Sequence, residues 1–108
     1  MRMDPGEQVA AERQLALRAA AEDGKDGVVR RLIGLKVDVN ATGAPLAQAA
    51  FNGHPAVVEL LVNAKADVER ADATGTTPLL FATQGGHASV VAKLLLAGAN
   101  PNVARTTN

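Results

Sequence analysis

The chain has 108 residues, with 11 Lys and Arg against 11 Asp and Glu, and no cysteine. This length permits one small domain, and the balanced charge gives no overall field that would attract nucleic acid. The lack of cysteine excludes disulfides, thiolate metal sites and thiol nucleophiles. Hydrophobic residues make up 47% of the chain but aromatic residues only 2%, so a core must be built mainly from Ala, Val and Leu, which suits closely packed helices.

Membrane and export signals are absent from the sequence pattern. No apolar run approaches the roughly 18–20 residues that a membrane-spanning helix needs. The start of the sequence, MRMDPGEQ, has no apolar signal-peptide core. We therefore expect a cytoplasmic protein whose partners are neither membranes nor nucleic acids.

The first predicted elements are a long and a short helix. Residues 7–22, EQVAAERQLALRAAAE, are rich in strong helix formers. Asp4 suits the N-cap of this helix, with Pro5 at the first helical position. After Gly24 a second helix is expected over residues 28–35, where one face is apolar. That face consists of Val28, Val29, Leu32 and Ile33.

The same order of helix, glycine and helix then returns twice. Residues 45–52 and 55–63 form the second predicted pair, and residues 78–85 and 88–97 form the third. The second and third copies lie 33 residues apart, and ten of 22 aligned positions are identical without a gap. Isolated helices shorter than about 12 residues are marginal in water, so each pair must bury its apolar face against the next. This period and pattern are typical of a solenoid.

The third copy carries a series of motif residues in a fixed order: Asp72, Gly75, Thr77-Pro78-Leu79, Ala82, Gly86-His87, Val90-Val91, Leu94-Leu95, Gly98-Ala99 and Asn102. With this order and spacing the chain resembles the ankyrin repeat family over residues 15–103. The resemblance implies an all-α solenoid of three antiparallel helix pairs joined by β-turn fingers, the first pair being an N-terminal capping repeat. We divide the single domain, 1–108, into repeats of about 7–40, 41–70 and 71–103, with 104–108 starting an incomplete finger.

Several positions depart from the family pattern. Ala44 stands where Thr77 supplies a capping hydroxyl in the third repeat, so we expect Ala44→Thr to raise the melting temperature. Lys36 and Lys65 take the place of Gly98. Strained or rearranged turns are predicted there, because glycine adopts positive φ at little cost and lysine does not.

The finger before the second inner helix is shorter than the others. Gly24 and Gly53 are 29 residues apart, against 33 between Gly53 and Gly86. The four missing residues fall between Val39 and Gly43. This is either a deletion of the kind that loops tolerate or a notch on the concave side that fits a partner.

The chemistry of a catalytic or metal site is not found in the sequence. His54 and His87 occupy equivalent turns, so the repeat itself explains why they recur, and we expect both to be structural. No cysteine and no carboxylate at ligand spacing joins them into a zinc site. There is no G-x-S-x-G elbow and no phosphate-binding loop. We predict no enzymatic activity, no metal and no cofactor.

Inner-helix positions 48 and 81 are equivalent in the two later repeats. We expect Phe81 in the core, because the family places a buried aliphatic residue at this position. Gln48 would then be a polar residue at a core position. It must find hydrogen-bond partners or destabilise the fold by roughly 1–3 kcal/mol.

The resemblance implies that a partner protein binds to the finger tips and to the exposed side of the inner helices. Phe51 is unusual there, because its equivalents, Glu22 and Gln84, are polar. It is either an exposed anchor of the kind that dominates interfaces or a residue that folds over the gap beside Ala47. The predicted partner-binding positions are Glu22, Asp23, Gly43, Phe51, Asn52, Ala71, Ala73, Thr74, Thr76, Gln84 and Gly85.

The last repeat raises a second hypothesis. Leu96 stands where the other repeats have Gly34 and Asn63, although the end of a solenoid normally needs a polar cap. Either the chain is a segment of a longer array or this end docks against another chain. We predict a protein-interaction scaffold. The alternative is a self-associating unit, such as a homodimer, that uses Leu94, Leu95 and Leu96.

Overall fold

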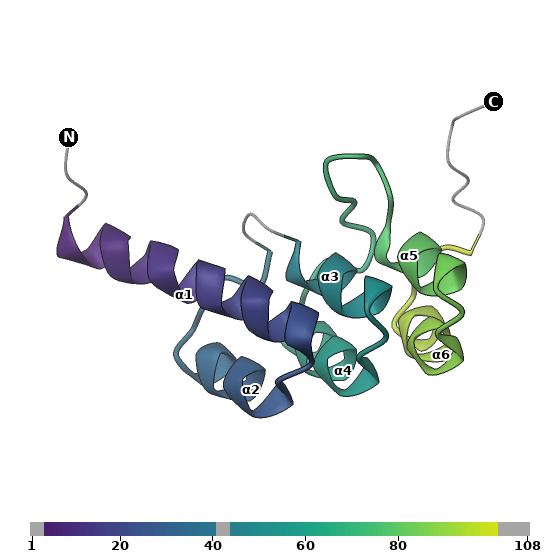
Figure 1. The fold of residues 1–108 in the computed structure, drawn as a ribbon, viewed down its shortest axis with the longest axis horizontal. Coiled ribbons are helices and arrows are strands. Elements are labelled where there is room, and N and C mark those ends of the chain that lie inside the picture. Colours follow the sequence, from purple (N-terminus) through teal and green to yellow (C-terminus); the bar gives the residue numbers. More distant parts are fainter. Residues whose placement is uncertain (1–3, 41–43, 102–108) are drawn as a thin grey trace.

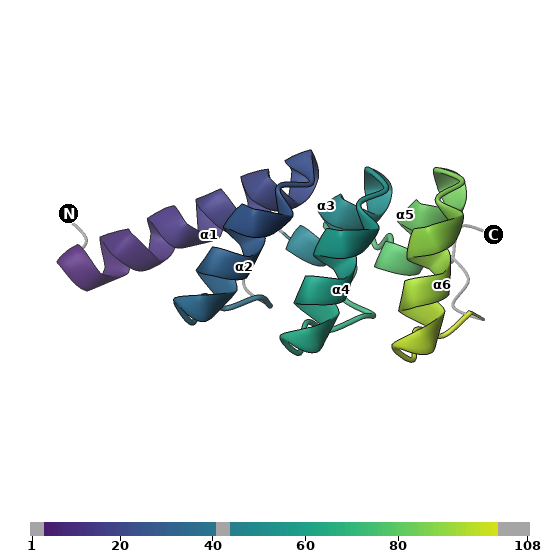
Figure 2. The same cartoon turned by 90° about the horizontal axis from the view of Figure 1, so that it is seen from below.

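The computed structural model describes residues 4–40 and 44–101, which contain six helices and no strand. Three antiparallel helix pairs stand side by side (Figures 1 and 2), and this confirms the all-α solenoid. The helices are α1 (Pro5–Asp23), α2 (Asp26–Gly34), α3 (Pro45–Phe51), α4 (Pro55–Asn63), α5 (Pro78–Gln84) and α6 (Ala88–Leu96).

Helix α1 is much longer than the other inner helices. It has 19 residues, while α3 and α5 have seven each, and its first turns project well past α2 (Figure 1). The start is fixed by Asp4, whose Oδ1 accepts a hydrogen bond from the backbone N–H of Glu7 at 2.8 Å. Asp4 is therefore the N-cap, as predicted, and Pro5 takes the first helical position. The helix ends at Gly24, whose φ of 73° lies in the left-handed region that glycine adopts at little cost.

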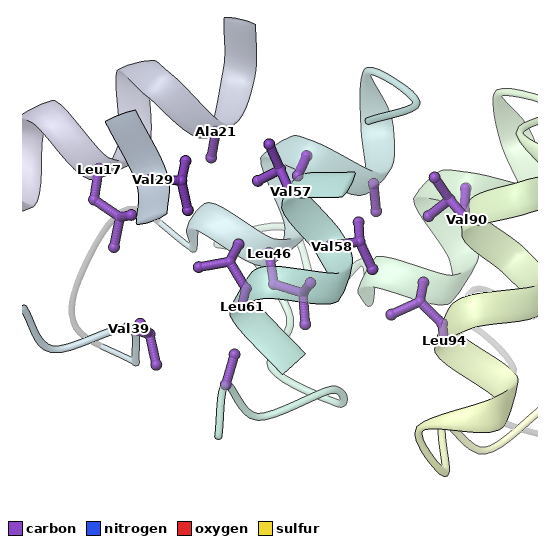
Figure 3. Close-up of a cluster of buried hydrophobic side chains, with 14 of the residues drawn as sticks. Leu17, Ala21, Val29, Val39, Leu46, Val57, Val58, Leu61, Val90 and Leu94 are labelled. Atoms are coloured by element: carbon purple, nitrogen blue, oxygen red, sulfur yellow. The ribbon is translucent and has the colours of Figure 1, made fainter. Parts of the chain in front are cut away.

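The helices form two layers, because α1, α3 and α5 pack in sequence as inner helices and α2, α4 and α6 as outer helices. Between the layers lies one apolar core (Figure 3). It is built mainly from small side chains, and Leu17, Leu61 and Leu94 are fully buried. Leu94 was predicted to take part in self-association, but it belongs to this core and is not available at the surface.

Each outer helix carries one valine that faces the preceding repeat. Val57 and Val90 hold this position in α4 and α6, and both are fully buried. Val28 holds it in α2 and is 45% exposed, although the apolar pattern predicts it on the buried face. The reason is its place in the stack, since no described repeat precedes the first pair and covers Val28.

Successive repeats are joined by the same contact, used twice. The Nε2 atom of His54 donates to the carbonyl of Glu22 at 2.8 Å, and that of His87 donates to the carbonyl of Phe51 at 2.9 Å. Each imidazole lies over a glycine of the preceding repeat, so closely that a Cβ on Gly24 or Gly53 would come within 2.5 Å of the ring. These histidines are therefore structural links between repeats.

The turns after the outer helices carry backbone strain in the first two repeats. Lys36 has a φ of 66° and Lys65 a φ of 73°, in the region where Gly98 has 97°. The strained turns predicted at these two lysines are confirmed. The carbonyl of Lys65 also accepts a hydrogen bond from Nδ2 of Asn40 at 3.1 Å, and Oδ1 of Asn40 accepts from the N–H of Asp67 at 2.7 Å. One asparagine thus ties the ends of the first two repeats together.

The two later inner helices begin differently. Thr77 is extended (φ −80°, ψ 162°), and its hydroxyl accepts a hydrogen bond from the N–H of Leu80 at 3.3 Å. Ala44 at the equivalent place is left-handed, with φ 44° and ψ 61°. A side-chain cap needs the extended conformation, so Ala44 is not simply a cap that lacks its hydroxyl, and the expectation built on that interpretation is corrected.

Candidate functional site

The exposed side of the three inner helices, together with the finger of residues 70–76, forms what we call the concave surface. A hollow of about 430 Å³ lies in it, between α1, the start of α3 and the finger. Two cationic side chains, Arg18 from α1 and Arg70 from the finger, border this hollow, and Gln48 from α3 contributes an amide. The remaining lining residues are Ala44, Ala71, Asp72 and Ala73.

The finger is held by hydrogen bonds to Asp72. Its Oδ1 accepts from the backbone N–H groups of Thr74 at 2.9 Å and Thr76 at 3.2 Å, and from the Thr74 hydroxyl. Gly75 lies in the turn with a φ of 80°. Glycine adopts this conformation at little cost, whereas a residue with a Cβ would be strained in it. Among the predicted binding residues, Ala73 and Thr74 are exposed at the tip. Thr76 is only 3% exposed, so it supports the finger from inside and cannot contact a partner in this structure.

Phe51 contacts the next repeat. Its ring meets that of Phe81 edge to face, with centroids 5.3 Å apart and planes at 75°, an arrangement that aromatic pairs favour. Phe51 nevertheless stays 50% exposed. Phe81 is partly buried and packs against the core. Phe51 therefore leans on α5 and still offers half of its surface to solvent.

The remaining predicted binding residues have different surroundings. Glu22 is half-buried and pairs with the exposed Arg18 at 3.5 Å. Solvent reaches both side chains and screens this ion pair. Asn52 donates through Nδ2 to the carbonyl of Glu22 at 3.2 Å, so it links repeats. Three more of the predicted partner-binding residues, Asp23, Gln84 and Gly85, are exposed, and Ala71 is half-buried. Gly43 lies outside the described residues.

Sequence reasoning missed Arg18, Gln48 and Arg70. Gln48 was expected in the core, but it is half-buried and borders the hollow. Arg18 precedes Glu22 by four residues, a spacing that places both on one side of α1. That spacing could have indicated a charged strip along the concave surface.

Within residues 4–40 and 44–101, no three His, Cys, Asp or Glu side chains come together in a way that could hold a metal ion. In the same part of the chain, no helix has the length and hydropathy to cross a membrane.

Comparison with known proteins identifies the family. A sequence model described as "Ankyrin repeats (3 copies)" matches residues 4–105. The chain belongs to the ankyrin repeat family. Ankyrin repeats are, in general, modules for protein–protein interaction, and the family is typically non-catalytic.

Ankyrin repeats of larger proteins resemble this chain. The Drosophila melanogaster "Ankyrin repeat and KH domain-containing protein mask" is 54% identical over 69 residues, which is 64% of this chain and 2% of that protein. The human "Ankyrin repeat and KH domain-containing protein 1" is 43% identical over 67 residues, 62% of this chain and 3% of that protein. "Ankyrin repeat domain-containing protein 29" of Danio rerio is 41% identical over 66 residues, 56% of this chain and 22% of that protein. The chain thus spans a small part of these relatives.

Proposed function

We propose that this ankyrin chain is a non-catalytic scaffold that binds a partner protein through its concave surface. The observation that carries this proposal is Phe51, an aromatic side chain 50% exposed where the equivalent residues are polar. A few large side chains, aromatic ones in particular, supply most of the binding energy of many interfaces. The partner would lie along the inner helices, with Phe51 as its apolar contact.

The physical basis of binding would be a surface that is already ordered. The finger is fixed by three hydrogen bonds to Asp72, and Phe51 is oriented by Phe81. Such groups lose little conformational entropy when a partner binds. At the start of α3, the hollow with Arg18, Gln48 and Arg70 offers hydrogen-bond donors to the partner.

Affinity capture from a cell extract tests this proposal. The immobilised chain is compared with Phe51→Ala and Arg70→Ala on the concave surface, and with Arg30→Ala on α2 as the matched control, since Arg30 is exposed on an outer helix. Loss of an anchor reduces affinity about tenfold or more, so a genuine partner should be depleted by Phe51→Ala and retained by Arg30→Ala. Circular dichroism confirms that each variant is folded. Equal recovery of every captured protein by all four forms would contradict the proposal.

A second candidate function is self-association through the C-terminal repeat. It is favoured by Leu96, which is 89% exposed, and by Leu95, which is 43% exposed. Light scattering over a range of concentrations tests it. A mass that rises with concentration and falls back in Leu96→Glu supports self-association, whereas a monomer at every concentration rules it out.

A further inference from the structure

The two internal interfaces of the stack follow one rule. Each repeat has a forward side, toward the next repeat, and a backward side, toward the preceding one. The glycine and the carbonyl lie on the forward side, and the histidine and a valine of the next repeat pack against them. At both interfaces the imidazole covers the glycine, and Nε2 reaches a carbonyl two residues before that glycine. The valine, Val57 or Val90, is fully buried.

The forward side of the third repeat has the same glycine and carbonyl, but no described residue packs against them. Gly86 has a φ of 70°, close to the 73° of Gly24 and Gly53, but a Cβ placed on it would meet no atom of the described residues within 4 Å. Beside it lies a hollow of about 420 Å³ whose lining includes Val91 and Leu95. Among the described residues, its lining contains no Asp, Glu, Lys or Arg side chain. We call it the forward face.

The backward side of the first repeat is the complementary surface. Val28 occupies the position of the buried Val57 and Val90, yet it is 45% exposed. We call this side of α2 the backward face. The glycine that an imidazole covers and the valine that is buried at both internal interfaces are thus uncovered by the described residues at Gly86 and Val28.

We propose that the forward face of one copy binds the backward face of a second copy, so that copies associate head to tail. This rests on the self-association proposed above and specifies its geometry. Each internal interface sets a forward face against a backward face, and an isologous pairing of two forward faces has no precedent within the chain. A head-to-tail contact does not close on itself, so it extends into open chains of copies.

One part of the contact is missing, and this provides a gain-of-function test. Lys25 stands where His54 and His87 stand in the later repeats, so a second copy offers no imidazole to Gly86 and to the carbonyl of Gln84. Association of the wild type should therefore be weaker than the packing between its own repeats. Lys25→His restores the missing hydrogen bond and should lower the dissociation constant about tenfold.

Sedimentation velocity on two blocking variants separates the geometries. Leu95→Glu blocks the forward face and Val28→Glu the backward face, and both positions are partly exposed, so the variants should remain folded, as circular dichroism will verify. Each variant alone should be monomeric. Their equimolar mixture should form a heterodimer that cannot extend, because each contributes the face that the other lacks.

Two other results of this experiment would contradict the head-to-tail proposal. If Val28→Glu alone still dimerises and Leu95→Glu does not, self-association survives but is isologous, and the head-to-tail proposal is wrong. If wild type, Lys25→His and the mixture all stay monomeric, self-association fails as well, and the projecting first turns of α1 (Figure 1) are the natural obstacle. Neither outcome affects binding at the concave surface.

Discussion

At the level of single residues, the most telling feature is a lysine in a glycine's conformation. Lys65 has a φ of 73°, where a side chain with a Cβ is less stable than glycine by about 1 kcal/mol. We expect Lys65→Gly to raise the free energy of unfolding by about this amount, measured by urea denaturation. The backbone carbonyl that Asn40 contacts is kept.

The matched control for Lys65→Gly is the reverse change in the third repeat. Gly98 has a φ of 97°, and a Cβ on it would meet no atom within 4 Å in the described part of the chain, so Gly98→Ala tests backbone conformation without a steric clash there. It should lower stability. If Lys65→Gly and Gly98→Ala shift the urea midpoint in the same direction, positive φ is not what determines stability at these turns.

Ala44 leads to a different prediction from the one that the sequence suggested. Because its φ is 44°, a β-branched residue there is strained, and its hydroxyl is not in the extended geometry of Thr77. We now expect Ala44→Thr to lower the melting temperature. Ala44→Gly, which relieves the strain, should leave it unchanged or raise it. A clear increase for Ala44→Thr alone would show that the backbone readily changes to the extended cap.

At the level of helices, α4 and α6 are joined by one exposed ion pair. Nζ of Lys93 donates to Oε2 of Glu59 at 2.8 Å, and this hydrogen bond, with the positive charge of the lysine, lowers the pKa of Glu59 below its ordinary value of 4.5. A lowered pKa in the folded state means that the pair stabilises the stack above pH 4.5. This contribution is lost as the pH falls through the lowered pKa.

Carbon-13 NMR of the Glu59 carboxyl group tests the pair directly. In the wild type its titration midpoint should lie below 4.5, and in Lys93→Gln it should return to about 4.5. Since the Glu59 side chain is 57% exposed, added salt should also raise the wild-type midpoint. Identical midpoints in both proteins would mean that the two side chains do not pair in solution.

The sequence predicted the helices well because their signals are local. Asp4, Thr77 and Gly86 each act within a few residues of a helix end, so type and limits could be inferred without the fold. The surroundings of Gln48 and Val28 could not, because the exposure of each depends on what the neighbouring repeat supplies. The same holds for the candidate site: Phe51 was identified from a difference between repeats, but its contact with Phe81 and the hollow beside Arg70 arise only when the repeats stack.

At the level of the whole molecule, stability depends on interfaces between neighbouring repeats. In a solenoid each repeat contacts only its neighbours, so the total is approximately a sum of repeat and interface contributions. In the described part of the chain, the contact between histidine and glycine occurs at both interfaces. A substitution that disrupts one such contact should therefore lower the interface contribution between two repeats, in addition to any strain at the substituted residue.

A pair of glycine variants isolates that coupling. Gly53 and Gly86 have nearly the same φ, 73° and 70°, so replacement by alanine strains the backbone equally. A Cβ on Gly53 would also come within 2.5 Å of the His87 ring, whereas one on Gly86 would meet nothing within 4 Å among residues 4–40 and 44–101. We expect Gly53→Ala to lower the free energy of unfolding more than Gly86→Ala does, and the difference measures the interface between the second and third repeats.

The comparison should be made by urea denaturation at low protein concentration, where copies do not associate. His87→Ala in the Gly53→Ala background completes a double-mutant cycle. If the ring is what the new Cβ meets, removing the imidazole abolishes the extra cost of Gly53→Ala. Equal losses for Gly53→Ala and Gly86→Ala would instead mean that His87 moves aside without a measurable loss of stability.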